Sequence, residues 1–163
     1  MNLGLDRGDP WLASVTALAD RHPDWPAEIM HWHDRWIEMT GPPIAHSVRL
    51  LRALRGKGIP VYALTNFGAE SFRLAIATYP FFGEFDGTLV SGEVGVMKPE
   101  PAIYEHVEAM AGLTGDAILF TDDNAANIAA AALRGWRTHL FTDAAPFAAR
   151  LVAEGLLTER QAA

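Results

Sequence analysis

The chain has 163 residues, of which 50% are hydrophobic and 20% are charged, so we expect one globular domain, with at most a small appendage, rather than a disordered segment or a coiled coil. A net charge of −7 argues against nucleic acid and anionic membranes as partners. The absence of cysteine excludes disulfides, thiolate metal sites and a cysteine nucleophile. Neither a signal-peptide pattern nor an apolar run of membrane-spanning length is present, which predicts a cytoplasmic protein.

Residues 9–39 predict two helices. Asp9 is expected to cap the first helix, with Pro10 at its first position. The second is expected to start at Asp24 and to carry one apolar stripe, formed by Ile29, Trp32, Trp36 and Met39. A Gly-Pro-Pro break at 41–43 ends it.

After residue 43 the pattern alternates between helices and short apolar runs. Helices are predicted over 44–58, 68–80, 99–112, 124–135 and about 144–154. Buried parallel strands are predicted over 59–65 and 117–123, and a third strand is predicted over 136–141. This alternation indicates a doubly wound, Rossmann-like α/β domain with a parallel sheet. Ligands bind such sheets outside the carboxyl ends of the strands, so polar residues directly after strands are the functional candidates.

Two of these candidates favour an anion. Thr65 and Asn66 follow the first predicted strand, where a hydroxyl, an amide and helix N–H groups make an anion cradle. The alternative is that Asn66 only caps the next helix. Lys98 precedes Pro99 in a Gly-rich loop, where it could neutralise a phosphate and a carboxylate together. A solvated lysine is the alternative for that position.

The third candidate is the acidic pair Asp122 and Asp123, which follows the apolar run ending in Phe120. Adjacent carboxylates repel each other unless a cation or hydrogen-bond donors compensate. Mg²⁺ is the natural partner because it is held by few carboxylates together with water and phosphate oxygens. The alternative is that one of the two acids caps the following helix.

In this order the segments "YALTNFGAESF", "SGEVGVMKPEPAIYEHV" and "LFTDDNAANIAAAALRGW" resemble three motifs of the haloacid dehalogenase (HAD) superfamily of hydrolases. The similarity spans about residues 9–155 and is greatest to the branch of haloacid dehalogenases and epoxide-hydrolase-type phosphatase domains. It implies a HAD-like α/β core over 44–163 and a partial helical cap over 1–43.

The resemblance also implies roles for single residues. Thr65 and Asn66 would bind the transferring phosphoryl group, and Lys98 would position the nucleophile and offset charge on the phosphate. Asp123 would be the direct Mg²⁺ ligand, with Asp122 beside it as a ligand or a neighbour of the ligands. Asn127 would orient the acidic loop.

The stretch "FDGTL" around Asp86 is similar to the opening motif of an aspartate-nucleophile phosphatase, but we interpret it as the segment before Lys98. Glu84 stands where the first aspartate of that motif belongs, and the stretch follows Thr65 instead of preceding it. Upstream, no aspartate follows a buried strand. We therefore expect that the family's first strand, with its Asp-x-Asp nucleophile, is absent and that the chain begins inside the cap.

A fragment, a misplaced start and a degenerate gene copy would each explain such a truncated chain. In the family that first strand lies between the strands that here end in Thr65 and Thr121, so two strand edges should lack partners.

Four tryptophans of the cap segment are expected to pack between its helices, with a substrate lining or a dimer contact as the alternative. These are Trp11, Trp25, Trp32 and Trp36.

The leading hypothesis is a Mg²⁺-dependent phosphatase-type hydrolase of a small phosphorylated metabolite, inactive as this chain because the nucleophile is missing. One alternative is a 2-haloacid dehalogenase acting on a halogenated substrate without a metal; those enzymes resemble Ser-Asn where this chain has Asp122 and Asp123. Another is a non-catalytic anion-binding pseudoenzyme. A receiver-like signalling domain ranks last, because it would place its acids after its first strand. An incomplete sheet favours a homo-oligomer.

Overall fold

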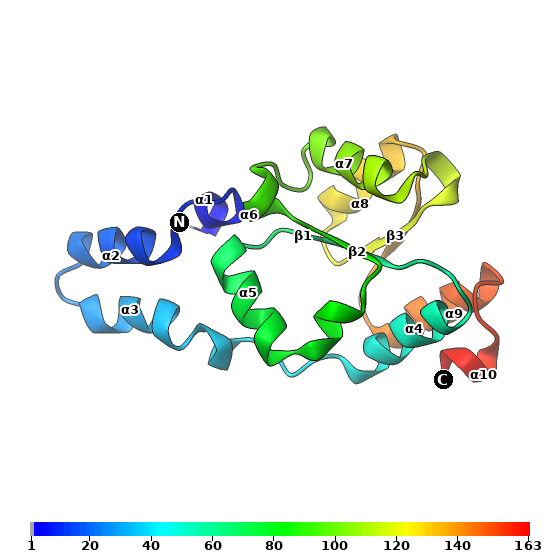
Figure 1. The fold of residues 1–163 in the computed structure, drawn as a ribbon, viewed down its shortest axis with the longest axis horizontal. Coiled ribbons are helices and arrows are strands. Elements are labelled where there is room, and N and C mark those ends of the chain that lie inside the picture. Colours follow the sequence, from blue (N-terminus) through cyan, green and yellow to red (C-terminus); the bar gives the residue numbers. More distant parts are fainter. Residues whose placement is uncertain (1) are drawn as a thin grey trace.

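The computed structural model describes residues 2–163 as an α/β fold with four-residue strands (Figure 1). The α-helices are α1 (Asn2–Asp6), α2 (Trp11–Arg21), α3 (Pro26–Asp34), α4 (Ala45–Gly56), α5 (Ala69–Thr78), α6 (Ser91–Val94), α7 (Pro101–Ala111), α8 (Ala125–Leu133), α9 (Ala144–Ala153) and α10 (Glu159–Ala162). The strands are β1 (Tyr62–Thr65), β2 (Gly87–Val90), β3 (Leu119–Asp122) and β4 (Arg137–Leu140). The 3-10 turns are η1 (Trp36–Met39), η2 (Pro80–Glu84) and η3 (Gly115–Ala117). Among these helices of residues 2–163, none combines the length and apolar composition that crossing a bilayer requires.

The strands form two separate parallel pairs. β1 pairs with β2, Tyr62 lying opposite Gly87, and β3 pairs with β4, Leu119 lying opposite Arg137. Within residues 2–163, β1 and β3 belong to different sheets, so each keeps one edge without a strand partner. The prediction of an α/β fold with parallel strands is confirmed. The unpaired edges of β1 and β3 agree with the separate expectation that two strand edges lack partners. β2 was not predicted, because its four residues lie in the segment interpreted as the approach to Lys98.

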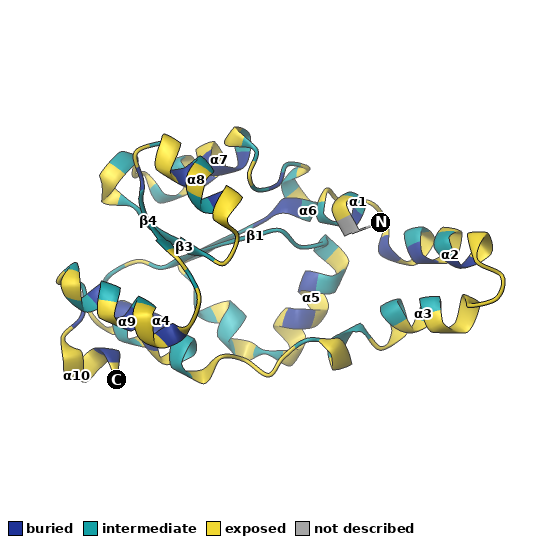
Figure 2. Cartoon of the chain, turned by 180° about the vertical axis from the view of Figure 1, so that it is seen from behind, coloured by how far each residue is buried: buried dark blue, intermediate teal, exposed yellow. Residues whose placement is uncertain are grey.

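Helices cover both faces of the strands. Figures 1 and 2 show α7 and α8 on one side and α4, α9 and α10 on the other. The cluster on the first side is built on Ile103, Tyr104, Val107, Ala131 and Trp136. The cluster on the second side is built on Leu50, Leu54, Ala148, Leu151, Leu157 and Ala162. This two-sided cover is the doubly wound arrangement that alternating helices and strands predict.

The first three helices form an arm that extends from the strands (Figure 1). Its small core contains Trp11, whose ring meets those of Trp32 and Trp36 edge-on at centroid distances of 6.0 and 5.7 Å. Packing between these helices is therefore confirmed for three of the four tryptophans. It is wrong for Trp25, which is 61% exposed. The assignment of residues 1–43 to a cap stays a prediction.

Two predicted helix starts lie two residues too early, and proline geometry explains both. The residue before a proline avoids the helical region. Glu100, before Pro101, is extended, so α7 begins at Pro101 and not at Pro99. Trp25, before Pro26, is likewise non-helical, so α3 begins two residues later than predicted.

At α2 the predicted cap is replaced by a contact from another helix. The helix begins at Trp11 with an extended Pro10 before it, and no side-chain cap is present. The Trp11 N–H instead donates to Glu70 Oε1 of α5 over 3.0 Å, so the arm is tied to the helix that follows β1. The short helices α1 and α10 were not predicted.

The prediction that the strands are buried is wrong for β1 and β3. All four residues of each have intermediate exposure, although helices lie over both faces (Figure 2). The open edges account for this difference, since a strand that pairs on one edge only is not closed off by a neighbour.

A substitution in the α7–α8 side of the core tests the packing. Ile103→Ala should lower the free energy of unfolding by about 2–5 kcal/mol, because Ile103 is fully buried and the surrounding cluster cannot close the void. Urea unfolding followed by circular dichroism measures the change. Leu133→Ala in α8 is the matched control: Leu133 is 90% exposed, so its loss should stay within about 0.5 kcal/mol. Equal losses in the two variants would contradict the assigned core.

Candidate functional site

Lys98 and Asp122 form a buried ion pair at the carboxyl ends of β1 and β3. The ammonium donates to Asp122 Oδ2 over 2.6 Å and to the carbonyl oxygen of Leu64 in β1 over 2.9 Å. Their side chains are only 10% and 6% exposed. One cation therefore joins the carboxyl ends of two strands that do not pair with each other.

The Asp122 carboxylate is bound on both of its oxygens. Oδ2 accepts from Lys98, while Oδ1 accepts from the Asn124 backbone N–H over 2.8 Å and from Asn127 Nδ2 over 2.9 Å. Burial by itself raises the pKa of Asp122, but the Lys98 hydrogen bond and these two donors outweigh it and hold the pKa below its usual value. Asp122 is therefore a fixed anion whose charge Lys98 balances.

Asn66 holds the loop that carries Lys98. Its Oδ1 accepts from the Lys98 backbone N–H over 2.8 Å, and its Nδ2 donates to the Lys98 carbonyl oxygen over 2.9 Å. The alternative that Asn66 caps the next helix is wrong, since Gly68 occupies that position of α5. Asn66 positions the lysine through its backbone.

The loop after β1 is also tied to the end of β2. Phe67 N–H donates to the hydroxyl of Ser91, which is fully buried at the start of α6, over 2.9 Å. The Gly92 N–H donates to the Phe67 carbonyl oxygen over 3.1 Å. A β-carbon at Gly92 would lie 2.7 Å from the Ala69 nitrogen, so only glycine fits. Sequence reasoning did not single out Ser91. Had β2 been predicted, the position of Ser91 directly after a strand would have marked it as a candidate.

Tyr104 supports the acidic loop from beneath. This residue of α7 is fully buried, and its hydroxyl donates to the Asn127 carbonyl oxygen over 3.0 Å. Burial, together with the nearby charge of Asp122, raises the pKa of Tyr104 to about 12, so it stays a neutral donor. The Asn127 amide in turn binds Asp122, which supports the prediction that Asn127 orients the acidic loop.

Thr65, Thr121 and Asp123 complete the predicted strand-end residues. Thr65 ends β1, and the Thr121 hydroxyl in β3 is buried without a partner among the described residues. Asp123 is exposed. Helix capping by one of the acids is wrong as well, because Asn124 caps α8 by accepting from the Ala126 N–H.

The acidic pair fits Mg²⁺ in donor type but supplies only part of a site. Within residues 2–163, no group of three or more acidic or histidine side chains could hold a metal ion. Asp122 is already bound on both oxygens, which leaves the exposed Asp123 as the free carboxylate. Mg²⁺ commonly takes one or two protein carboxylates and completes its shell with water and phosphate oxygens.

Asp86 lies at the opposite end of the strands. It precedes β2, and its carboxylate binds the Arg55 guanidinium over 3.0 Å and the Val61 N–H over 2.8 Å. The Arg55 hydrogen bonds, with that of Val61, hold the pKa of Asp86 below its usual value. Its role is to tie α4 to the amino ends of β1 and β2, as expected of a residue that is not the nucleophile.

Comparison with protein families gives a match over residues 9–155 to the haloacid dehalogenase-like hydrolases. The sesquiterpene phosphatase astK of Aspergillus oryzae is 35% identical over 89 residues, which cover 55% of this chain and 45% of that protein. An (S)-2-haloacid dehalogenase of Pseudomonas fluorescens is 28% identical over 103 residues, covering 63% of this chain and 44% of that protein. The chain thus spans less than half the length of these two relatives.

Among solved structures, a HAD family enzyme of Bacteroides thetaiotaomicron in complex with magnesium and inorganic phosphate superimposes with a TM-score of 0.53 at 29% identity. The superposition covers 60% of this chain and 51% of that one.

Removing the cation tests the ion pair. Lys98→Met should lower the free energy of unfolding by about 3 kcal/mol at pH 7, because the buried Asp122 carboxylate loses its counter-charge. Urea unfolding at pH 7 and pH 3 measures the loss and its pH dependence.

The sign of that dependence follows from the lowered pKa of Asp122. A depressed folded-state pKa contributes stability above the unfolded value of about 3.9, and this is lost as pH falls through the folded pKa. In Lys98→Met burial dominates and the folded-state pKa rises, so the difference between the two proteins should shrink at pH 3. Lys57→Met, at an exposed lysine that binds only the Leu156 carbonyl, is the control. A loss that is independent of pH would contradict the pairing.

Proposed function

The chain belongs to the haloacid dehalogenase-like hydrolases, and we propose that it carries the phosphate-binding and Mg²⁺-binding part of a phosphatase-type site for a small phosphorylated metabolite. The observation that carries this proposal is the buried Lys98–Asp122 pair, locked by Asn66 and Asn127 at the carboxyl ends of the strands. Ligands of parallel α/β sheets bind at that edge.

Phosphoryl transfer suits these residues because it depends on positioning and on stabilising negative charge. Lys98 supplies a fixed positive charge, and the Thr65 hydroxyl at the end of β1 is assigned as a donor to phosphate oxygens. Asp122 holds the Lys98 ammonium in place, so the lysine does not pair with another carboxylate. The phosphatase and the magnesium–phosphate complex among the relatives support this assignment.

Asp123 is proposed as the direct Mg²⁺ ligand, with Asp122 next to it. When bound, the ion would supply charge neutralisation for the phosphate oxygens. Asp123 is exposed and leaves room for water and phosphate ligands.

We propose further that phosphate binds without turnover by this chain alone. Of the two carboxylates at the carboxyl end of β3, that of Asp122 is bound on both oxygens and that of Asp123 is assigned to the ion. Neither is then available as the nucleophile that covalent phosphatase chemistry requires.

The second candidate is a 2-haloacid dehalogenase, which the Pseudomonas fluorescens relative favours. The two candidates differ in their need for metal. A dehalogenase should release halide in the presence of EDTA, whereas the acidic pair of this chain favours a metal-dependent site.

Calorimetric titration tests the proposal directly. In the presence of inorganic phosphate the chain should bind Mg²⁺, and Asp123→Asn should weaken that binding by about tenfold or more, because a ligand oxygen loses its charge. Asp116→Asn is the matched control, since Asp116 is exposed in η3 at the amino end of β3 and should leave the affinity unchanged.

Turnover is measured on the same samples. The wild-type chain should release phosphate from p-nitrophenyl phosphate no faster than the Lys98→Met variant does. Neither protein should release halide from 2-chloropropionate. Equal Mg²⁺ affinity of Asp123→Asn and Asp116→Asn would contradict the assignment of Asp123 as the Mg²⁺ ligand. Halide release that continues in the presence of EDTA would contradict the phosphatase proposal and favour the dehalogenase.

A further inference from the structure

The segment directly after α1 fastens the arm to the loops at the carboxyl ends of the strands. The Arg7 guanidinium binds the Glu100 carboxylate with both of its terminal nitrogens: Nη2 lies 2.8 Å from Oε1, and Nη1 donates to Oε2 over 3.3 Å. Gly8 lies against α6, because a β-carbon added to it would come within 2.8 Å of the Gly92 carbonyl oxygen. This segment therefore meets both the helix that follows β2 and the residue before α7.

Glu100 also closes the turn that carries Lys98. Its Oε1 accepts from the Met97 N–H over 3.3 Å, and its own N–H donates to the Met97 carbonyl oxygen over 2.8 Å. Within this turn of residues 97–100, Asn66 binds the Lys98 backbone. The turn is thus held by one side chain from the loop after β1 and by that of its own last residue. The carboxylate that closes the turn is the one that the arm binds.

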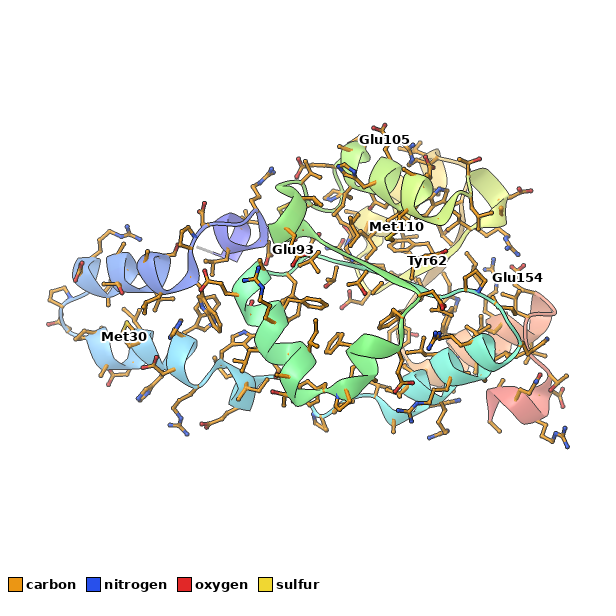
Figure 3. The ribbon with its side chains drawn as sticks, in the orientation of Figure 1. Met30, Tyr62, Glu93, Glu105, Met110 and Glu154 are labelled. Atoms are coloured by element: carbon orange, nitrogen blue, oxygen red, sulfur yellow. The ribbon has the colours of Figure 1, made fainter. Side chains whose placement is uncertain are left out.

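Arg7 moves with the arm because α1 belongs to the arm's core. Leu5 of α1 packs with Trp11 of α2 in one buried cluster. Met30 of α3 packs against the same cluster, and Figure 3 shows it between α2 and α3. A shift of α2 and α3 would therefore also move Arg7 relative to the turn of residues 97–100.

Further contacts hold the arm against α5 and the loop after β1. The Trp36 ring of η1 meets the Phe67 ring edge-on at a centroid distance of 5.4 Å. Glu70 of α5 accepts from the Trp11 N–H over 3.0 Å. These contacts fix the arm in place but do not involve the turn of residues 97–100. That turn meets the arm through the ion pair.

We propose that Arg7 and Glu100 are positioning residues for Lys98, so that attachment of the arm increases the affinity of the site for phosphate. The inference rests on the proposed function, which assigns Lys98 to phosphate. A turn that is held by its own carboxylate and by the arm has fewer conformations to lose when the ligand binds, and preorganisation of this kind strengthens binding. Glu100 closes the turn, and Arg7 keeps the carboxylate in the closing position.

An alternative role for Arg7 is direct attraction of the phosphate through its charge. Such an effect would not need Glu100, whereas positioning requires it. The Glu100 carboxylate already binds both terminal nitrogens of Arg7, which favours positioning. A double-mutant cycle separates the two roles, because it measures whether the effect of one residue depends on the other.

Calorimetric titration of inorganic phosphate in the presence of Mg²⁺ measures the affinity. Arg7→Met should weaken phosphate binding about twofold to fivefold, the range expected from loss of one partly exposed ion pair. In a Glu100→Gln background the same change should have no further effect. Arg21→Met is the matched control: Arg21 is an exposed arginine in the last turn of α2, and its loss should leave the affinity unchanged.

Hydrogen exchange of the phosphate-free chain tests the positioning without the ligand. The Met97 amide should exchange faster in Arg7→Met, and in Glu100→Gln, than in the wild type, because the carboxylate that holds it is no longer fixed by the arm. The difference should shrink between about 50 and about 500 mM salt, since salt screens an exposed ion pair. Glu93→Gln, at an exposed residue of α6 labelled in Figure 3, should leave this exchange unchanged. If one of the two variants fails to fold, the other supplies the same test.

Two results would overturn the proposal. The first is exchange at Met97 that is equal in Arg7→Met and in the wild type. The second is a loss of phosphate affinity that persists in the Glu100→Gln background, which would assign Arg7 to direct attraction of the ligand. Failure of the proposed function gives a different result: the wild type would bind no phosphate, while exchange at Met97 would still depend on Arg7.

Discussion

The contact between Lys98 and Asp122 is the interaction on which the arrangement of the site depends. It joins β1 to β3 at their carboxyl ends, where no strand pairing does so. The pair is buried, so its attraction is screened less than that of a surface pair, and loss of either partner leaves an uncompensated charge. Asn66 binds the backbone of Lys98 and Asn127 binds the carboxylate of Asp122, and these hydrogen bonds hold the two charged groups in position.

Apolar packing holds the two sheets together where a hydrogen-bonded ladder would do so in a continuous sheet. On one face Leu64 and Leu89 of the first sheet share a cluster with Phe120 of the second. On the other face Val61 and Leu119 share a cluster. Side-chain packing is non-directional, so it unites the faces without pairing the backbone edges. The fold is thus closed above and below the strands and open between them.

The two ends of the strands serve different purposes. At the amino ends Arg55 binds Asp86, which also accepts from Val61, and this contact fastens α4 to the first sheet. At the carboxyl ends the charges belong to the loops that follow the strands. Thr65, Asn66, Lys98 and the acidic pair gather there because parallel strands deliver their last residues to one edge. Similar ion pairs therefore lie at the two ends of the strands: the one at the amino ends fastens a helix to a sheet, and the one at the carboxyl ends lies in the proposed ligand site.

The sequence by itself determined the alternation of helices and strands, the family and the candidate residues at the strand ends, because these depend on local periodicity and on short motifs. Only the tertiary structure decided the hydrogen-bond partners. Asn66 binds the backbone of Lys98, 32 positions away, instead of capping its own helix, and Asn124 takes the capping role that the acidic pair could have filled. The separation of β1 from β3 and the pairing of β2 with β1 were likewise decided in three dimensions, since strand pairing is set by which edges packing brings together and not by the residues of one strand.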